Sequence, residues 1–172
     1  PTDNRLVGNC PLRAPPSGVT KFVFGLPVQG GYALADLEGS VDLVLVDAPC
    51  TGTGTWRRRP DAKWRLRPNA LAARMKDQDH VLDEAARFAS PSGRIVYVTC
   101  SILPEEDEDR VAAFLARHTG WRLTDPTARL APEMAGKLAP FVRRGVDGTP
   151  ALRLTPATAG TDGFFVAVLE RG

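Results

Sequence analysis

The sequence predicts an α/β domain of the doubly wound type. Two apolar runs rich in β-branched residues, 41–47 and 94–99, have the composition of strands buried on both faces of a sheet. The segment between them repeats its apolar residues with a helical period, and a second helical segment follows the later run. Strand, helix, strand, helix and strand in succession is the order typical of this fold class.

The first forty residues carry weaker signals. Residues 1–20 are rich in Pro and have little apolar periodicity, which predicts irregular chain. Residues 21–24 predict a short strand, and residues 32–37 predict one or two helical turns. We therefore expect 1–40 to be an irregular or atypical N-terminal segment, ahead of a domain that occupies 41–172.

A long helix is expected between the two predicted strands. Pro68 suits the first position of a helix, because its missing N–H would have no partner there. The apolar residues then recur with the helical period, and the segment 90–93 (Ser-Pro-Ser-Gly) ends the helix. The residues that carry this period are Leu71, Met75, Leu82, Ala85 and Ala89.

A second helix is expected to begin at Pro104 and to end at the His-Thr-Gly segment 118–120. The acidic run 105–109 is interpreted as its first turn, where the helix dipole favours anions, and as a solvated face without a chemical role. The apolar face of this helix consists of Val111, Phe114 and Leu115.

The C-terminal part of the chain predicts two further strands, at 151–154 and 164–169. Residues 125–150 contain several Pro residues and no clear period, so no element is predicted there. The sequence contains no internal repeat and no low-complexity segment.

Composition narrows the class of protein. The 172 residues suffice for one domain with a core, and 43% apolar with 24% charged residues is typical of a globular chain. A net charge of +2 permits an RNA partner without requiring one. Three cysteines are too few for a disulfide framework, which favours a reducing compartment and a cytoplasmic location. No membrane span or secretion signal is predicted.

The two histidines do not predict a metal site. His80 falls on the long predicted helix and His118 at the end of the second one. Neither has a partner at the spacing of metal ligands, so surface or capping roles are expected for both.

Cys50 and Cys100 each follow a predicted strand. Parallel neighbouring strands lie about 4.8 Å apart and end at the same edge of the sheet, so both sulfurs and the Asp47 carboxylate are expected to converge there. A thiolate at this edge can act as a nucleophile, and a helix N-terminus after Cys100 would lower its pKa. The alternative is that both cysteines are small buried apolar residues. A disulfide between them is not expected in a reducing compartment.

A basic segment lies shortly after Cys50. Clustered cations with interleaved aromatic rings suit phosphate contact and base stacking, which predicts an RNA-binding surface. The alternative is a solvated basic surface on which the tryptophans are packed anchors. The residues concerned are Arg57, Arg58, Arg59, Lys63, Trp64 and Arg65, together with Trp56 and Arg67.

Four motifs occur in one order along the chain: DAPCTGTG, WRRRPDAKWR, TCSILPEEDE and GTDGFF. In this order and spacing they resemble the RNA cytosine-5 methyltransferases of the RsmB/NOP2/Sun family, whose fourth motif reads close to DAPCSGTG and whose sixth contains TCS followed by PEE. The resemblance spans about residues 41–172. It implies a Rossmann-like class I methyltransferase fold.

The resemblance also implies roles for the site residues. In the family the cysteine of the sixth motif, here Cys100, attacks C6 of a cytosine, and C5 then takes a methyl group from S-adenosylmethionine. Asp47 would contact the cytosine edge or lie by the cofactor with Pro49, and Cys50 would assist loss of the C5 proton. The basic segment would bind RNA, with ribosomal RNA favoured over transfer RNA. The cytosine must be unstacked to be reached.

The chain departs from the family in its N-terminal part. The glycine-rich cofactor loop and the first strands are not recognisable, the glycine cluster at 25–31 is a poor substitute, and Asp36 is a poor match for a third-strand aspartate. Thr51 stands where the family has Ser. We therefore expect 41–172 to be the C-terminal half of a catalytic domain, either as a fragment or with its other half supplied by another chain.

Two alternatives remain open. The first is an RNA-binding remnant without turnover, which would bind RNA but not the cofactor. The second is a Cys-dependent hydrolase, which requires a histidine near Cys100. The sequence leaves the oligomeric state open.

Overall fold

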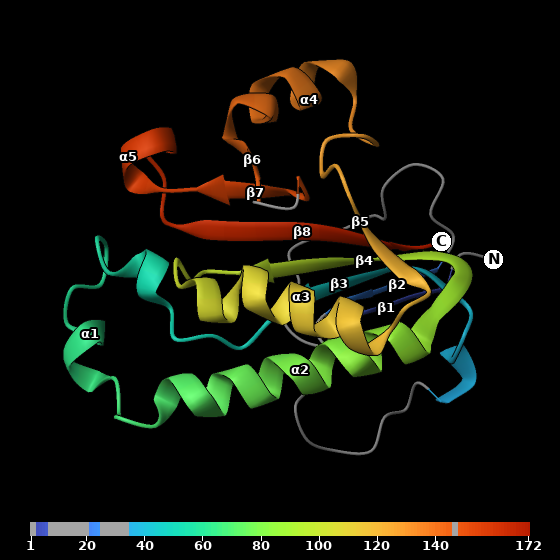
Figure 1. The fold of residues 1–172 in the computed structure, drawn as a ribbon, viewed down its shortest axis with the longest axis horizontal. Coiled ribbons are helices and arrows are strands. Elements are labelled where there is room, and N and C mark those ends of the chain that lie inside the picture. The colour runs from blue at the N-terminus through green and yellow to red at the C-terminus, as the bar shows by residue number, and fades with distance from the viewer. Residues whose placement is uncertain (1–2, 7–20, 25–34, 146–147) are drawn as a thin grey trace.

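The computed structural model describes residues 3–6, 21–24, 35–145 and 148–172, and Figure 1 draws their arrangement. These residues form one mixed sheet of eight strands in the order β1-β2-β3-β4-β8-β7-β6, with β5 paired to β8. The strands are β1 (Asp3–Leu6), β2 (Lys21–Phe24), β3 (Val41–Asp47), β4 (Ala89–Thr99), β5 (Trp121–Thr124), β6 (Val142–Arg144), β7 (Pro150–Leu154) and β8 (Phe164–Arg171). The α-helices are α1 (Ala62–Arg65), α2 (Ala70–Phe88), α3 (Glu108–Arg117), α4 (Pro132–Leu138) and α5 (Pro156–Ala159).

Strands β1 to β4 are parallel, and β8 runs antiparallel to β4. The prediction that 41–47 and 94–99 are parallel neighbours is confirmed. The short strand predicted at 21–24 is also confirmed, and it pairs with β3, so that edge of β3 is covered. The glycine cluster at 25–31 lies outside the described residues.

Strand β4 begins earlier than predicted. The segment 90–93, expected to break the chain, belongs to β4, and the pairing with β3 shifts register between Val41 and Leu43. A Cβ atom on Gly93 would lie 2.6 Å from the Val41 carbonyl oxygen, so only glycine permits this close approach. The irregularity at this point is a bulge within a continuous strand.

The core lies where α2 and α3 pack against the sheet and against each other, as Figure 1 shows. Val44 and Ile95 from the strands, Leu82 from α2 and Phe114 from α3 are all fully buried in it. A smaller cluster of Leu43, Leu45 and Val96 marks the other face of the sheet. Strand β3 therefore has apolar contacts on both faces, as its continuous apolar run predicts.

Both long helices begin later than predicted. Pro68 lies in a turn that the Ala70 N–H closes onto the Arg67 carbonyl, so α2 begins at Ala70. Pro104 begins a 3₁₀ helix (Pro104–Glu106), and the backbone of Asp107 then leaves the helical region before α3 starts at Glu108. The predicted end of this helix at 118–120 is confirmed.

Several short elements have no clear signal in the sequence. Strand β1 lies within residues 1–20, where irregular chain is expected, and the sequence does not predict strand β5 or helix α1. The segment 125–150 contains α4 and β6. Each is too short to show a period. The predicted strands at 151–154 and 164–169 correspond to β7 and β8. Of the helical turns predicted at 32–37, the structure describes residues 35–37, and these form a 3₁₀ helix, Ala35–Leu37.

Among the described residues, no helix is both long and apolar enough to cross a membrane. The same residues contain no group of three or more His, Cys, Asp or Glu placed to hold a metal ion.

Candidate functional site

The two cysteines meet at the carboxyl edge of the parallel strands. Asp47 pairs with Val98 in the β3–β4 register, and the Ala48 N–H donates to the Val98 carbonyl at 2.8 Å. The loops that follow place the Cys50 and Cys100 sulfurs 3.3 Å apart. Both side chains are half-buried free thiols, so the predicted convergence is confirmed.

The pKa values of the two thiols are shifted in opposite directions. The hydrogen bond from Cys50 lowers the pKa of Cys100 to about 7, although burial and the Asp47 charge oppose this shift. The same contact, together with burial, raises the pKa of Cys50 far above its ordinary range. Cys100 therefore ionises more readily than Cys50, and the Cys50 thiol can donate to the Cys100 thiolate. The main cause is the Cys50 thiol, and not the helix N-terminus that the sequence suggested, because α3 begins only at Glu108.

Asp47 and Pro49 stand beside this pair. The Asp47 side chain is exposed at the end of β3, and partial desolvation raises the pKa of its carboxyl. Pro49 is half-buried, and its carbonyl accepts a hydrogen bond from Gln78 of α2 at 2.9 Å. Asp47 thus presents an ionisable group to solvent, close enough for its charge to raise the pKa of Cys100.

A buried polar network holds the loop after Cys100. The Thr53 and Ser101 hydroxyls, both buried, lie 3.0 Å apart. The Ile102 N–H donates to the Thr53 hydroxyl at 3.0 Å, and the Leu103 N–H donates to the Ser101 hydroxyl at 3.1 Å. The residues that follow the two cysteines are therefore bonded to each other as well as to their own strands.

Two glycines join three of the sequence motifs. The Gly54 N–H donates to the Cys100 carbonyl at 2.9 Å, and the Gly163 N–H donates to the Gly54 carbonyl at 2.8 Å. A Cβ atom on Gly54 would lie 2.8 Å from the Cys100 carbonyl oxygen and still closer to that of Gly163. Both contacts are with backbone, which cannot move aside as a flexible side chain can, so this crossing requires glycine.

The prediction of a solvated acidic run is wrong at two positions. Glu106 and Asp107 are fully buried, and the backbone of Asp107 leaves the helical region at this point. Asp107 accepts a hydrogen bond from the Thr99 hydroxyl at 2.6 Å and lies 3.1 Å from the Arg153 guanidinium. Burial nevertheless raises the pKa of Asp107 to about 7.

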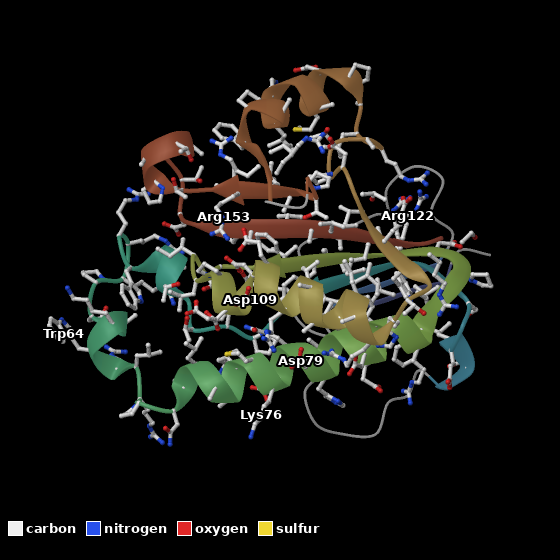
Figure 2. All side chains as sticks on the ribbon, in the orientation of Figure 1. Trp64, Lys76, Asp79, Asp109, Arg122 and Arg153 are labelled. Carbon is white, nitrogen blue, oxygen red and sulfur yellow. The ribbon has the colours of Figure 1, made fainter. Side chains whose placement is uncertain are left out.

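The basic segment divides into a packed part and an open part. Arg58 donates to Asp162 at 2.9 Å, Arg57 lies 3.7 Å from the same carboxylate, and Trp56 is half-buried. Trp64 is 81% exposed, with the Lys63 ammonium 4.7 Å from its ring centroid. Figure 2 shows Trp64 pointing away from the body of the molecule.

A pocket of about 500 Å³ links the basic segment to Cys50. Cys50 and Thr51 line one side of it, and cationic side chains from the chain around α1 and α2 line the other. Those cations are Arg65, Arg67 and Arg74. The Arg65 side chain also pairs with Asp61 within α1.

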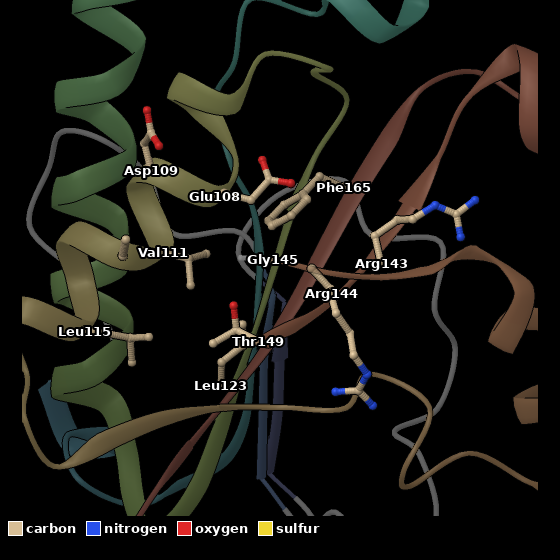
Figure 3. A pocket seen from close by; sticks show the side chains of 12 residues that line it. Glu108, Asp109, Val111, Leu115, Leu123, Arg143, Arg144, Gly145, Thr149 and Phe165 are labelled. Carbon is tan, nitrogen blue, oxygen red and sulfur yellow. The ribbon is translucent and has the colours of Figure 1, made fainter. Parts of the chain in front are cut away.

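A second pocket of about 500 Å³ lies away from the cysteines, between α3 and the β6–β7 hairpin (Figure 3). Val111, Leu115 and Leu123 provide an apolar wall, while Arg144 and Glu108 stand at its rim. Neither cysteine lines it, so this pocket is separate from the thiol site.

The histidines lie elsewhere. His118 stacks on Phe114 and its Nε2 lies 2.8 Å from Asp83, while His80 is exposed on α2. The sulfur partner of Cys100 in the described structure is Cys50. The arrangement therefore gives no support to a Cys–His hydrolase.

Comparison with known proteins places this site in context. The family model described as 16S rRNA methyltransferase RsmB/F matches residues 29–170. A Mycobacterium tuberculosis protein named as a methyltransferase is 40% identical over 152 residues, which cover 86% of this chain and 31% of that protein. The ribosomal RNA small subunit methyltransferase B of Vibrio cholerae is 37% identical over 131 residues, covering 76% of this chain and 26% of its own.

A solved structure supports the same relationship. The crystal structure of NSun6 from Pyrococcus horikoshii, determined with SFG, superposes with a TM-score of 0.62 at 26% identity. The match covers 88% of this chain and 35% of that one. The chain thus spans only about a third or less of the length of these relatives.

Substituting Gly54→Ala tests the glycine crossing. The added Cβ meets two carbonyl oxygens, so we expect the free energy of unfolding to fall by about 2 kcal/mol or more, measured by urea denaturation. Gly136→Ala is the matched control, because its Cβ meets open space within α4 and alanine favours helix by up to about 1 kcal/mol. Equal stability of the Gly54 variant and the natural chain would contradict the close contact.

The pH dependence of Cys100 reactivity tests the thiol pair. Alkylation of Cys100 by iodoacetamide, followed by peptide mass spectrometry, should rise with pH and reach half its maximum near pH 7. In Cys50→Ala the hydrogen-bond donor is removed, so the midpoint should move upward. In Asp47→Asn a nearby negative charge is removed, so the midpoint should move downward. An alkylation midpoint that is the same in Cys50→Ala as in the natural chain would show that the two sulfurs do not interact.

Proposed function

Since the chain belongs to the RsmB/F family of S-adenosylmethionine-dependent RNA cytosine methyltransferases, we propose that its two-cysteine site forms 5-methylcytosine in RNA, with Cys100 as the nucleophile. The observation that carries the proposal is the 3.3 Å contact between the Cys50 and Cys100 sulfurs at the strand edge. Ribosomal RNA is the proposed substrate, in keeping with the name of the Vibrio cholerae relative. We place this activity in the cytoplasm, where thiols remain reduced.

In the proposed first step, the Cys100 thiolate adds to C6 of the cytosine, and the ring electrons move toward C5. A pKa near 7 for Cys100 keeps a large fraction of the thiol ionised at neutral pH. Burial raises the pKa of the Asp47 carboxyl, which makes this group easier to protonate, so it can share a proton with the ring nitrogen N3 as negative charge develops there. Both groups lie at the same edge of the sheet.

Cys50 has the properties needed for the closing step. Its pKa is raised in part by the thiolate charge on Cys100, and that charge disappears once the bond to C6 has formed. Cys50 can then lose its proton to solvent and accept the C5 proton after methylation. The C5–H electrons restore the C5–C6 double bond, the bond from sulfur to C6 breaks, and Cys100 leaves as a thiolate.

The described residues provide a strand edge of the kind at which α/β proteins bind a cofactor such as S-adenosylmethionine. The parallel strands β1 to β4 all run toward this edge, and Asp47 and Pro49 lie at the end of β3, which also pairs with β2. S-adenosylmethionine supplies the methyl group when bound. We propose Asp47 and Pro49 as the residues of 41–172 that contact it, with 41–172 forming the C-terminal part of the catalytic domain.

The exposed part of the basic segment is proposed to bind RNA. Trp64 presents a free ring face on which an unstacked base can pack, and Lys63 and Arg59 add positive charge beside it. The pocket lined by Arg65, Arg67 and Cys50 gives a cationic path from this surface to the thiols. A chain that binds RNA here without turning it over is the second candidate.

Separate roles for the two cysteines predict opposite results for the two alanine variants. Cys100→Ala should abolish methylation and form no covalent complex, because the nucleophile is gone. Cys50→Ala should accumulate a protein–RNA adduct that survives denaturing electrophoresis, because proton loss from C5 is impaired. Full turnover by Cys100→Ala would overturn the mechanism. RNA binding without methylation by the natural chain would favour the second candidate.

The RNA surface is tested by salt. Changing Arg59, Lys63 and Arg67, which are all exposed, together to Ala should reduce the slope of log affinity against log salt by about 2, because each phosphate that is no longer neutralised removes about 0.7. The matched control changes Arg122, Arg129 and Arg143 to Ala, since these exposed arginines lie away from the site. The slope is measured by fluorescence anisotropy. An unchanged slope in the first variant would show that this segment is solvated surface that does not contact RNA phosphates.

A further inference from the structure

Glu106 is a fully buried carboxylate whose hydrogen bonds all reach toward Cys50. Its Oε1 accepts from the Thr51 N–H at 2.8 Å, and its Oε2 accepts from the Thr51 hydroxyl. Thr51 is the residue immediately after Cys50. Burying a carboxylate is unfavourable unless its oxygens are hydrogen-bonded, and here the bonds are made to the loop that carries the thiol.

Gln78 of α2 completes this arrangement from the other side. Its side chain is fully buried, and its Nε2 donates both to Glu106 Oε1 at 3.1 Å and to the Pro49 carbonyl at 2.9 Å. Pro49 immediately precedes Cys50. The two neighbours of Cys50 in the chain are therefore held by one bonded pair of side chains, which we call the Glu106–Gln78 clamp.

The clamp is attached to the strand that leads to Cys100. The hydroxyl of Tyr97, buried on β4, donates to the Glu106 carbonyl at 2.7 Å. The Glu106 N–H donates to the Leu103 carbonyl at 3.0 Å, within the loop that follows Cys100. Glu106 thus connects the Cys50 loop to the Cys100 loop through short hydrogen bonds on both sides.

We propose that Glu106 is a positioning residue that, through Thr51 and Gln78, holds the Cys50 thiol against Cys100. Glu106 does not touch the reacting atoms. Without it, the Cys50 loop loses two hydrogen bonds from Thr51, and Gln78, which holds Pro49, loses a third, so the loop gains freedom to move the thiol away from its partner. Its importance for turnover rests on the proposed function, but the placement of the thiols can be measured without RNA or cofactor.

The experiment measures how readily the two thiols form a disulfide. The purified chain is equilibrated with mixtures of oxidised and reduced glutathione, and the Cys50–Cys100 disulfide is quantified by peptide mass spectrometry. Two electrons pass from the two thiols to one oxidised glutathione, which is released as two reduced molecules. At half oxidation, the squared concentration of reduced glutathione divided by that of oxidised glutathione gives the effective concentration of one thiol at the other.

Glu106→Ala should lower this effective concentration at least tenfold. Glu106→Gln keeps the shape and can still accept from the Thr51 N–H, so it should restore most of the natural value. Glu105→Ala is the matched control, since it removes an adjacent but exposed carboxylate and should change nothing. A Glu106→Ala chain that folds and retains the natural effective concentration would overturn the proposal.

Thr51→Val keeps the test decisive if Glu106→Ala does not fold. It removes only the hydroxyl that bonds Glu106 and should lower the effective concentration by a smaller factor, about threefold. No change in this variant would also count against the clamp. The RNA assay then separates the positioning role of Glu106 from the proposed function. If Glu106→Ala lowers the effective concentration and accumulates the protein–RNA adduct, both claims are supported. If the effective concentration falls but neither this variant nor the natural chain ever forms an adduct, the positioning role stands and the proposed function is wrong.

Discussion

The parallel pairing of β3 with β4 is the constraint on which the candidate site depends, because it brings together two loops that lie fifty residues apart in the chain. Asp47 faces Val98 in this register, so the chain leaves both strands at the same level of the sheet. A shift of one residue would turn Val44 and Val46 out of the main core, and the apolar contacts with α2 oppose that change. The apolar packing therefore also fixes where the thiols meet.

Polar contacts then convert this rough proximity into a defined geometry. The backbone bond between Gly54 and Cys100, the paired hydroxyls of Thr53 and Ser101, and the Glu106–Gln78 clamp each join the two loops at a different point. All are buried or nearly so, where the loss of a hydrogen bond is costly. A thiol pair whose pKa values differ widely needs such fixed surroundings, because the division of charge depends on the contact between the two sulfurs.

The elements with strong apolar periodicity were predictable, and so was the convergence of Cys50, Cys100 and Asp47, since parallel strands end at a common edge. The burial of Glu106 was not. It depends on the backbone of Asp107 leaving the helical region after a 3₁₀ turn, and a run of acidic residues is more typical of an exposed first turn. The hydrogen bonds from Thr51 and Gln78, which satisfy this carboxylate, join segments that no local pattern connects.

The central claim is that the thiol pair belongs to a site that uses S-adenosylmethionine. Isothermal titration calorimetry of the purified chain with this cofactor, alongside a thermal melt to establish that the chain is folded, tests the claim most directly. We predict saturable binding that is weakened in Asp47→Ala. A folded chain that gives no binding heat and no stabilisation at millimolar cofactor would contradict the claim.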